Sequence, residues 1–157
     1  MIEEKMKQMK HLSRSPQETS NLAKLFAQEL LKTKPEKYAL VIGFIGELGT
    51  GKTTFIRSFL RASGVKARIV SPTFIFSRRY KSRLKYYQDI WHFDVYRLGS
   101  PREVREIGLR EAVSQDKNLV IVEWADKVKG LLPKGTVWVE FKHGVKSNER
   151  HITFNRR

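Results

Sequence analysis

The segment "GELGTGKTTF", Gly46–Phe55, decides the fold of this chain. Within it, Gly46, Gly51, Lys52 and Thr53 match the pattern G-x-x-x-x-G-K-[ST]. Glycines at these places let the backbone bend, so that successive N–H groups form a nest for a phosphate chain. The segment therefore predicts a phosphate-binding loop. Lys52 would hold the β- and γ-phosphates, and the Thr53 hydroxyl would bind Mg²⁺.

The residues on either side of the loop supply the context that this motif needs. "YALVIGFIG", residues 38–46, is an apolar run of strand length, and "TTFIRSFLRASG", residues 53–64, reads as a helix that ends at Gly64. A strand before the loop and a helix after it favour a nucleotide site over a glycine-rich turn without a ligand. The candidate nucleotide-binding residues are Gly46, Glu47, Leu48, Gly49, Thr50, Gly51, Lys52, Thr53, Thr54 and Thr73.

Two further helices are predicted from their N-terminal caps and their apolar spacing. "SPQETSNLAKLFAQELLK", residues 15–32, begins with Ser15 as the cap, Pro16 at the first helical position and Glu18 to close a capping box. Its apolar residues recur at helical spacing, so one face is expected to be buried. Residues 100–115, "SPREVREIGLREAVSQ", repeat the same cap pattern and predict a second helix of this kind.

The remaining segments read as strands. We expect antiparallel strands within residues 67–80 and 84–98, a short buried strand at residues 118–124, and a hairpin from residues 135–144 and 149–156. Together the patterns predict a single three-layer α/β domain over residues 15–157, with a mostly parallel central sheet and antiparallel hairpin additions. Residues 1–14 are polar and charged, and we expect them to form a flexible N-terminal segment.

A nucleotide site of this type needs a carboxylate beside Mg²⁺, and two candidates end predicted strands. Glu123 closes "LVIVE", and Asp94 lies in "HFDVYR". Because ligands bind at the carboxyl edge of parallel sheets, either residue is placed to meet the nucleotide. One would coordinate the metal or its water shell, and the other would position the attacking water. Together with Lys52 they form the candidate catalytic set. The alternatives are a strand-end salt bridge for Glu123 and a turn cap for Asp94.

Other residues carry a functional and a structural interpretation side by side. Thr73 in "SPTF" is either a sensor of the γ-phosphate or a turn hydroxyl beside Pro72. Trp124 either packs near the nucleotide or belongs to the core. His92 either orients Asp94 or a partner, or it is structural. Residues 78–87, "RRYKSRLKYY", interleave basic and aromatic side chains, which is typical both of base stacking and of a solvated hairpin tip.

Composition limits the classes of protein that this chain can belong to. It has no cysteine, so disulfides and thiolate metal sites are excluded, which fits a cytoplasmic protein. No apolar run reaches the roughly 20 residues that span a bilayer, so no membrane association is expected. Thirty-one Lys plus Arg against sixteen Asp plus Glu give a net charge of +15. Such a charge indicates either a face that binds polyanions, such as nucleotides, nucleic acid or acidic protein partners, or a basic composition spread over a solvated surface.

With these residues located, the sequence resembles the TsaE (YjeE) family over residues 18–150. The resemblance depends on five motifs in order: "GELGTGKTTF", "SPTF", "HFDVYRL", "EIGL" and "VIVEW". The phosphate loop is shared by many hydrolases and kinases, whereas the later motifs at these separations are far more discriminating. After "GL" the family often carries an acidic and aromatic segment, and this chain has "REAVSQ" instead, which leaves open a partner contact from this helix.

The resemblance implies a P-loop NTPase-like fold that binds ATP and Mg²⁺. It further implies weak intrinsic hydrolysis, stimulated by a complex of TsaB and TsaD that modifies tRNA to threonylcarbamoyladenosine. By motif, the family's important acidic residues correspond to Asp94 and Glu123, and its threonines to Thr53 and Thr73. Its tryptophan corresponds to Trp124. Hydrolysis would reset the modification complex between turnovers and would not be the step that modifies adenosine.

Two other functions are weighed against this one. A small-molecule kinase would use the same loop, but it needs a lid that closes over the transferring phosphate. No arginine-bearing lid insertion is evident, and residues 78–85 lie between predicted strands. A non-enzymatic nucleic-acid-binding module would use the positive charge and would leave Lys52 and Thr53 unexplained. It predicts RNA binding that depends steeply on salt and is indifferent to ATP.

Overall fold

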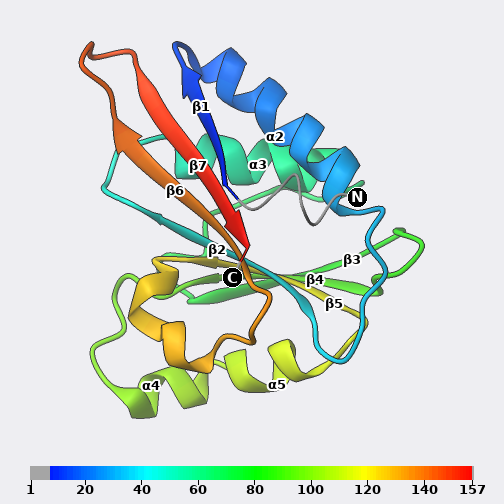
Figure 1. Ribbon diagram of the computed structural model, residues 1–157. Helices are drawn as coiled ribbons and strands as arrows, with labels where there is room; N and C mark the ends of the chain where they lie inside the picture. Colours follow the sequence, from blue (N-terminus) through cyan, green and yellow to red (C-terminus); the bar gives the residue numbers. More distant parts are fainter. Residues whose placement is uncertain (1–7, 157) are drawn as a thin grey trace.

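The computed structural model describes residues 8–156, which form a central sheet covered by helices on both faces (Figure 1). Along the chain, the elements are β1 (Met9–Ser13), α2 (Pro16–Leu30), β2 (Leu40–Gly46), α3 (Lys52–Ala62), β3 (Ser77–Lys81), β4 (Asp89–Asp94), α4 (Pro101–Glu106), α5 (Leu109–Ser114), β5 (Asn118–Glu123), the 3₁₀ helix η1 (Ala125–Leu131), β6 (Val137–His143) and β7 (Arg150–Arg156).

The seven strands lie in the order β1-β7-β6-β2-β5-β4-β3. The four central strands, β6, β2, β5 and β4, run parallel, whereas β1, β7 and β3 are added antiparallel. This arrangement confirms the expected three-layer α/β fold with a parallel centre and antiparallel additions. All the parallel strands end at the same edge of the sheet, so the loops that follow them share that edge.

Two hydrophobic cores hold the layers together. Side chains of β2 alternate between them: Leu40, Ile42 and Phe44 face α2 and α3, while Val41 faces α5 and η1. Because both faces of the sheet are covered, β2 and the interior of β5 consist of apolar residues, which explains their near-continuous apolar runs. Figure 1 shows α2 and α3 on one side of the sheet, with α4, α5 and η1 on the other.

The N-terminal segment differs from its prediction. Met9–Ser13 form β1, which pairs antiparallel with β7, so this part of residues 1–14 belongs to the sheet. The side chain of Ser13 is fully buried, and its hydroxyl lies 2.8 Å from that of Thr19 on α2. Residues 1–7 lie outside the described part of the chain. The polar sequence of β1 did not indicate a strand. It can form one because β1 is an edge strand, with only one neighbouring strand and one covered face.

The helices confirm most of the cap predictions and correct two details. Ser15 caps α2 by accepting a hydrogen bond from the N–H of Glu18, but the Glu18 carboxylate accepts from the N–H of Arg14 and does not close a box on Ser15. The expected helix over residues 100–115 is broken into α4 and α5. Gly108, with φ +77°, separates the two, and Ser100 forms the complete capping box of α4.

The predicted strand at residues 67–80 is also shorter than expected. Only Ser77–Lys81 form β3, paired antiparallel with β4. Residues 67–76 instead form a loop that turns at Pro72, whose carbonyl accepts hydrogen bonds from the N–H groups of Ile75 and Phe76. This loop leaves Phe74 and Ile75 exposed, and it carries Thr73 to the carboxyl edge of the sheet, beside Asp94 at the end of β4.

Candidate nucleotide-binding site

The predicted phosphate loop connects the end of β2 to the first turn of α3 at the carboxyl edge of the sheet. Gly46 starts it with φ +147°, and a Cβ there would lie 2.5 Å from the carbonyl oxygen of Phe141 on β6. Gly51 ends it with φ +95° and precedes the first residue of α3. Only glycine fits such a close approach and such a left-handed turn without strain. The loop therefore presents the N-terminus of α3 to the space above the sheet.

Lys52 lies at the centre of this loop and is buried. Its ammonium group donates hydrogen bonds to the carbonyl oxygens of Gly46 and Glu47, and it lies 4.4 Å from the ring centroid of Trp124. Burial lowers the pKa of Lys52 below its usual value, and the negative charges of Glu123 and Asp94 oppose this effect. The ammonium group is therefore held among carbonyls, an aromatic face and two carboxylates.

The two predicted carboxylates end neighbouring parallel strands. Asp94 on β4 and Glu123 on β5 are register partners, and both are nearly fully buried. Asp94 accepts hydrogen bonds from the Thr73 hydroxyl at 2.8 Å and from the N–H of Tyr96 at 2.9 Å. Glu123 Oε2 lies 2.9 Å from Nε2 of His92. Both carboxylates are thus fixed by neighbours on the same edge of the sheet.

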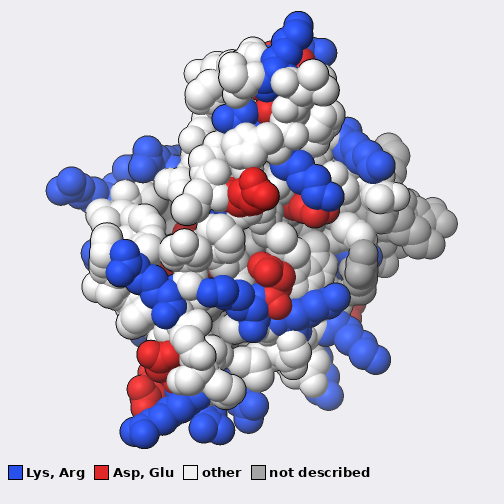
Figure 2. Space-filling model, turned by 90° about the vertical axis from the view of Figure 1, so that its left-hand side faces the viewer, with Lys and Arg blue, Asp and Glu red and all other residues white. Residues whose placement is uncertain are grey.

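One cavity of about 360 Å³ brings these parts together. Its lining consists of Leu48, Gly49, Thr50, Gly51, Lys52, Thr53, Thr54, Ser71, Thr73, Asp94, Tyr96, Glu123 and Trp124. Gly46 and Glu47 do not line it, and they contact the site through the carbonyls that hold Lys52. Figure 2 views the molecule from this edge and shows basic side chains surrounding a smaller acidic group. The sequence motifs therefore meet in a single concave site.

Several residues of the cavity were missed or undervalued by sequence reasoning. Ser71 lines it, with its hydroxyl 2.7 Å from that of Thr73. Tyr96 lines it too, and its ring centroid lies 4.7 Å from that of Trp124. Trp124 follows β5 with a positive φ of 60°; it lines the cavity and also packs against the core on that side of the sheet. The signal for Ser71 and Tyr96 was their place within the "SPTF" and "HFDVYR" motifs.

The basic and aromatic segment at residues 78–87 does not offer a stacking surface. Tyr80 and Tyr87 are buried in the core, and Tyr87 donates a hydrogen bond to the carbonyl of Thr33. Arg79 and Lys81 both pair with Asp89. The structure thus favours the hairpin interpretation, because two of the three rings cannot reach a base.

The donor set of the site fits Mg²⁺ bound together with phosphates. Thr53 and the carboxylates of Asp94 and Glu123 supply the oxygen ligands that Mg²⁺ prefers. Among residues 8–156 there is no group of three or more His, Asp or Glu side chains that would hold a metal by itself. An ion here would therefore complete its shell with phosphate oxygens and water, as Mg²⁺ commonly does. In the same residues, no helix is long and apolar enough to cross a membrane.

The fold and its phosphate loop define the chain as a P-loop NTPase-like protein. A crystal structure of YdiB from Bacillus subtilis superposes with a TM-score of 0.71 at 32% identity, covering 94% of this chain and 84% of that one. The family model described as "Threonylcarbamoyl adenosine biosynthesis protein TsaE" matches residues 13–152. The chain belongs to the TsaE family, which takes part in tRNA threonylcarbamoyladenosine biosynthesis.

Individual relatives agree with this assignment. A Rickettsia prowazekii (strain Madrid E) protein named tRNA threonylcarbamoyladenosine biosynthesis protein TsaE is 40% identical over 133 residues, which cover 84% of this chain and 85% of that protein. A Bacillus subtilis (strain 168) protein of the same name is 34% identical over 149 residues, covering 95% and 86% of the two chains. The family resemblance inferred from the five motifs is confirmed.

Proposed function

We propose that this protein binds ATP with Mg²⁺ in the cavity beside α3 and hydrolyses it in support of tRNA threonylcarbamoyladenosine modification. The observation that carries the proposal is the meeting of the phosphate loop with Asp94 and Glu123 in one cavity. A triphosphate needs a concentration of N–H donors and positive charge, and its hydrolysis needs carboxylates to govern the metal and a water. The cavity supplies both.

Each residue of the site has a distinct role in this proposal. The loop N–H groups and Lys52 bind the phosphates, and Thr53 contributes a metal ligand. Mg²⁺, when bound, neutralises the charge that develops on the phosphate oxygens. Among the described residues, both oxygens of Asp94 accept hydrogen bonds, whereas only Oε2 of Glu123 has a partner. Thr73 is held against Asp94, at the place where a residue that senses the γ-phosphate would act.

The role in the pathway follows from the family. We propose that hydrolysis is slow in the isolated protein, that a TsaB–TsaD complex stimulates it, and that it resets that complex between turnovers. The basic side chains around the cavity would then meet polyanionic tRNA held by the same assembly (Figure 2). If the protein contacts tRNA directly, its affinity for tRNA should fall steeply as the salt concentration rises.

The decisive experiment is a phosphate-release assay with γ-labelled ATP, with and without the TsaB–TsaD complex. Label should appear as inorganic phosphate, faster with the complex, whereas a labelled metabolite would identify a kinase. Glu123→Gln and Asp94→Asn should retain ATP binding but lose most hydrolysis, and their Mg²⁺ dependence should differ, because only one residue contacts the metal. Lys52→Ala should weaken ATP binding. Unchanged affinity in Lys52→Ala would refute the phosphate-loop assignment.

A further inference from the structure

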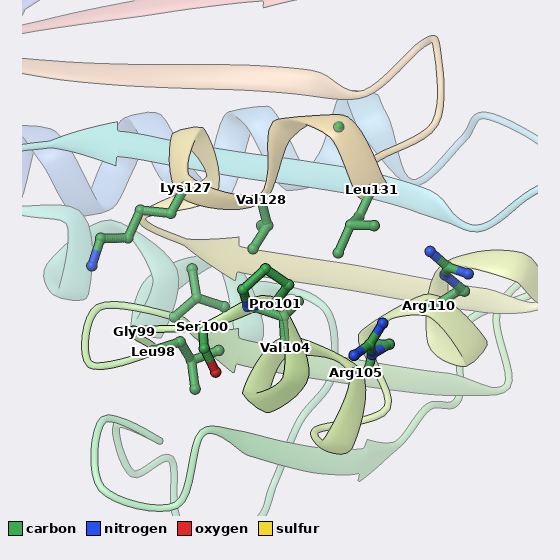
Figure 3. Close-up of a pocket in the computed structure, with 12 residues that line it drawn as sticks. Leu98, Gly99, Ser100, Pro101, Val104, Arg105, Arg110, Lys127, Val128 and Leu131 are labelled. Atoms are coloured by element: carbon green, nitrogen blue, oxygen red, sulfur yellow. The ribbon is translucent and has the colours of Figure 1, made fainter.

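A second and larger cavity lies between α4 and η1, on the face of the sheet opposite α2 and α3 (Figure 3). It measures about 490 Å³, within the range of ligand-binding pockets. Figure 3 shows Val128 and Leu131 of η1 pointing toward Pro101 and Val104 of α4 across the groove. The floor is apolar and is completed by Val95 and Leu98.

The charged side chains that line this groove are all cationic. They are Arg105, Arg110 and Lys127, and among residues 8–156 no acidic side chain lines it. Lys127 lies at one end, and Arg105 and Arg110 lie together at the other. Within residues 8–156, neither Arg105 on α4 nor Arg110 on α5 forms an ion pair. Arg102, which lies on α4 outside the groove, pairs with Glu106 at 2.9 Å. Two neighbouring unpaired guanidinium groups beside an apolar floor are suited to a carboxylate-bearing ligand.

One contact links this groove to the nucleotide cavity. The Lys127 ammonium group donates a hydrogen bond to the carbonyl of Tyr96 and lies 5.4 Å from its ring centroid. Tyr96 in turn donates its N–H to Asp94 and stacks against Trp124, and both of those residues line the nucleotide cavity. A carboxylate that draws Lys127 toward the groove would therefore loosen the backbone next to Asp94.

We propose that the groove between α4 and η1 docks an acidic, apolar segment of a protein partner, and that docking is transmitted through Lys127 and Tyr96 to the nucleotide site. The transmission rests on the proposed ATP-binding function, whereas the docking does not. The partner segment would place apolar side chains on the floor and carboxylates at the two cationic ends. This is the pattern by which amphipathic segments bind grooves, with charge fixing their register.

The chemistry of the lining favours protein over nucleic acid. Single-stranded nucleic acids bind through aromatic side chains on which bases stack, and in the part of the chain that the structure describes no aromatic side chain lines this groove. An apolar floor contributes little to a phosphate backbone, but it buries aliphatic side chains well. The floor and the cationic ends together thus match a segment that carries both kinds of side chain.

The test uses the full chain and a fluorescein-labelled synthetic peptide with a Leu/Val-rich centre and two Glu residues at each end. Its affinity is measured by fluorescence anisotropy without nucleotide, so that the result does not depend on ATP binding. Arg105→Glu/Arg110→Glu should weaken binding at least about tenfold, because attraction becomes repulsion. Arg102→Glu is the matched control on α4 and should change affinity less than about twofold. A peptide with Gln in place of Glu should bind the unmodified protein more weakly than the acidic peptide does, because the attraction to the arginines is lost.

Three outcomes would overturn the docking proposal: equal affinity of the double variant and the unmodified protein, equal affinity of the Gln peptide, or RNA of the same charge binding more tightly at the same arginines. Arg105→Gln/Arg110→Gln, which only removes charge, gives the same comparison should the reversed charges disturb folding.

The transmission is tested by the affinity for a fluorescent ATP analogue with and without saturating peptide. A shift is expected in the unmodified protein and none in the double variant. An unchanged affinity refutes the transmission alone, and no analogue binding at all refutes the proposed function.

Discussion

His92 is the residue whose role the structure changes most. A lone histidine on a strand is ordinarily a core residue, and His92 is indeed buried. Its Nε2, however, lies 2.9 Å from Glu123 Oε2, while among the described residues its Nδ1 has no partner. Because a carboxylate only accepts hydrogen bonds, Nε2 is the protonated nitrogen, and it fixes one oxygen of Glu123. The other oxygen is left for the chemistry of the cavity.

Replacing His92 should therefore affect both folding and turnover. His92→Ala removes the only donor that residues 8–156 offer to the buried Glu123 carboxylate, and it should lower the free energy of unfolding by about 2 kcal/mol in urea denaturation. Under the proposed function, kcat for ATP hydrolysis should fall while KM stays constant, because Glu123 remains but is no longer held. His92→Gln retains a donor at the corresponding place and should recover most of kcat. Equal kcat values for His92→Ala and His92→Gln would contradict the role of His92 in holding Glu123.

Tyr87 provides a pH-dependent prediction that does not involve the nucleotide. Burial raises the pKa of its phenol from 10.0 to about 12. Between these values the unfolded chain loses the phenol proton and the folded chain keeps it, so the free energy of unfolding falls as pH rises. Two pKa units correspond to roughly 2–3 kcal/mol. Urea titrations from about pH 9 to pH 12 should show this decline in the unmodified protein and a flatter profile in Tyr87→Phe. If the free energy of unfolding depended on pH in the same way in the unmodified protein and in Tyr87→Phe, this prediction would be wrong.

At the scale of elements, the end of β2 is tightly constrained by its neighbour β6. Gly46→Ala would place a Cβ 2.5 Å from the Phe141 carbonyl, so β2 and β6 would have to separate. Gly51→Ala has the same kind of backbone strain, but its nearest neighbour would be a methyl group of Thr19 at 4.0 Å. Thermal or urea denaturation should show a loss of about 3 kcal/mol for Gly46→Ala and about 1 kcal/mol for Gly51→Ala. Equal losses would show that backbone conformation, and not contact with β6, sets the cost.

Elements defined by local chemistry could be predicted from the sequence, and elements defined by distant neighbours could not. The caps at Ser15 and Ser100 and the apolar run of β2 are encoded within a few residues, and all three are confirmed. The short strand β3 depends on where β4 offers a partner, and the loop before it depends on the backbone turn at Pro72. Such features are set by pairing that no local pattern reveals.

The same distinction holds for the candidate site. The phosphate loop could be selected from its motif, Asp94 and Glu123 because each ends a predicted strand, and Thr73 because of its place after the helix that follows the loop. The structure brings residues 48–54 of the loop, Thr73 and both carboxylates to one cavity. The roles of Tyr96 and His92 could not be predicted from the sequence. They depend on contacts across the β4–β5 pair, where Tyr96 contacts Trp124 and His92 contacts Glu123. The groove between α4 and η1 had no sequence signal, since its two sides come from separate segments.

At the scale of the whole molecule, β1 protects the edge of the sheet. Deleting residues 1–13 would expose β7 as an edge strand and remove the buried Ser13. We expect a lower melting temperature and concentration-dependent association in size-exclusion chromatography, because an uncovered strand edge pairs with other chains. Deleting residues 1–7 leaves β1 in place and is the matched control. The prediction is contradicted if the two deletions have the same melting temperature and stay monodisperse.

The pairing of β1 with β7 also determines when the protein can be completed during its synthesis. Met9 lies opposite Phe154, so β1 leaves the ribosome long before the strand that it pairs with. Until β7 has been synthesised, β1 stays unpaired, even though the phosphate loop and the strands beside it have already been made. An unpaired strand edge can associate with other chains, so this interval exposes the nascent protein to misassembly.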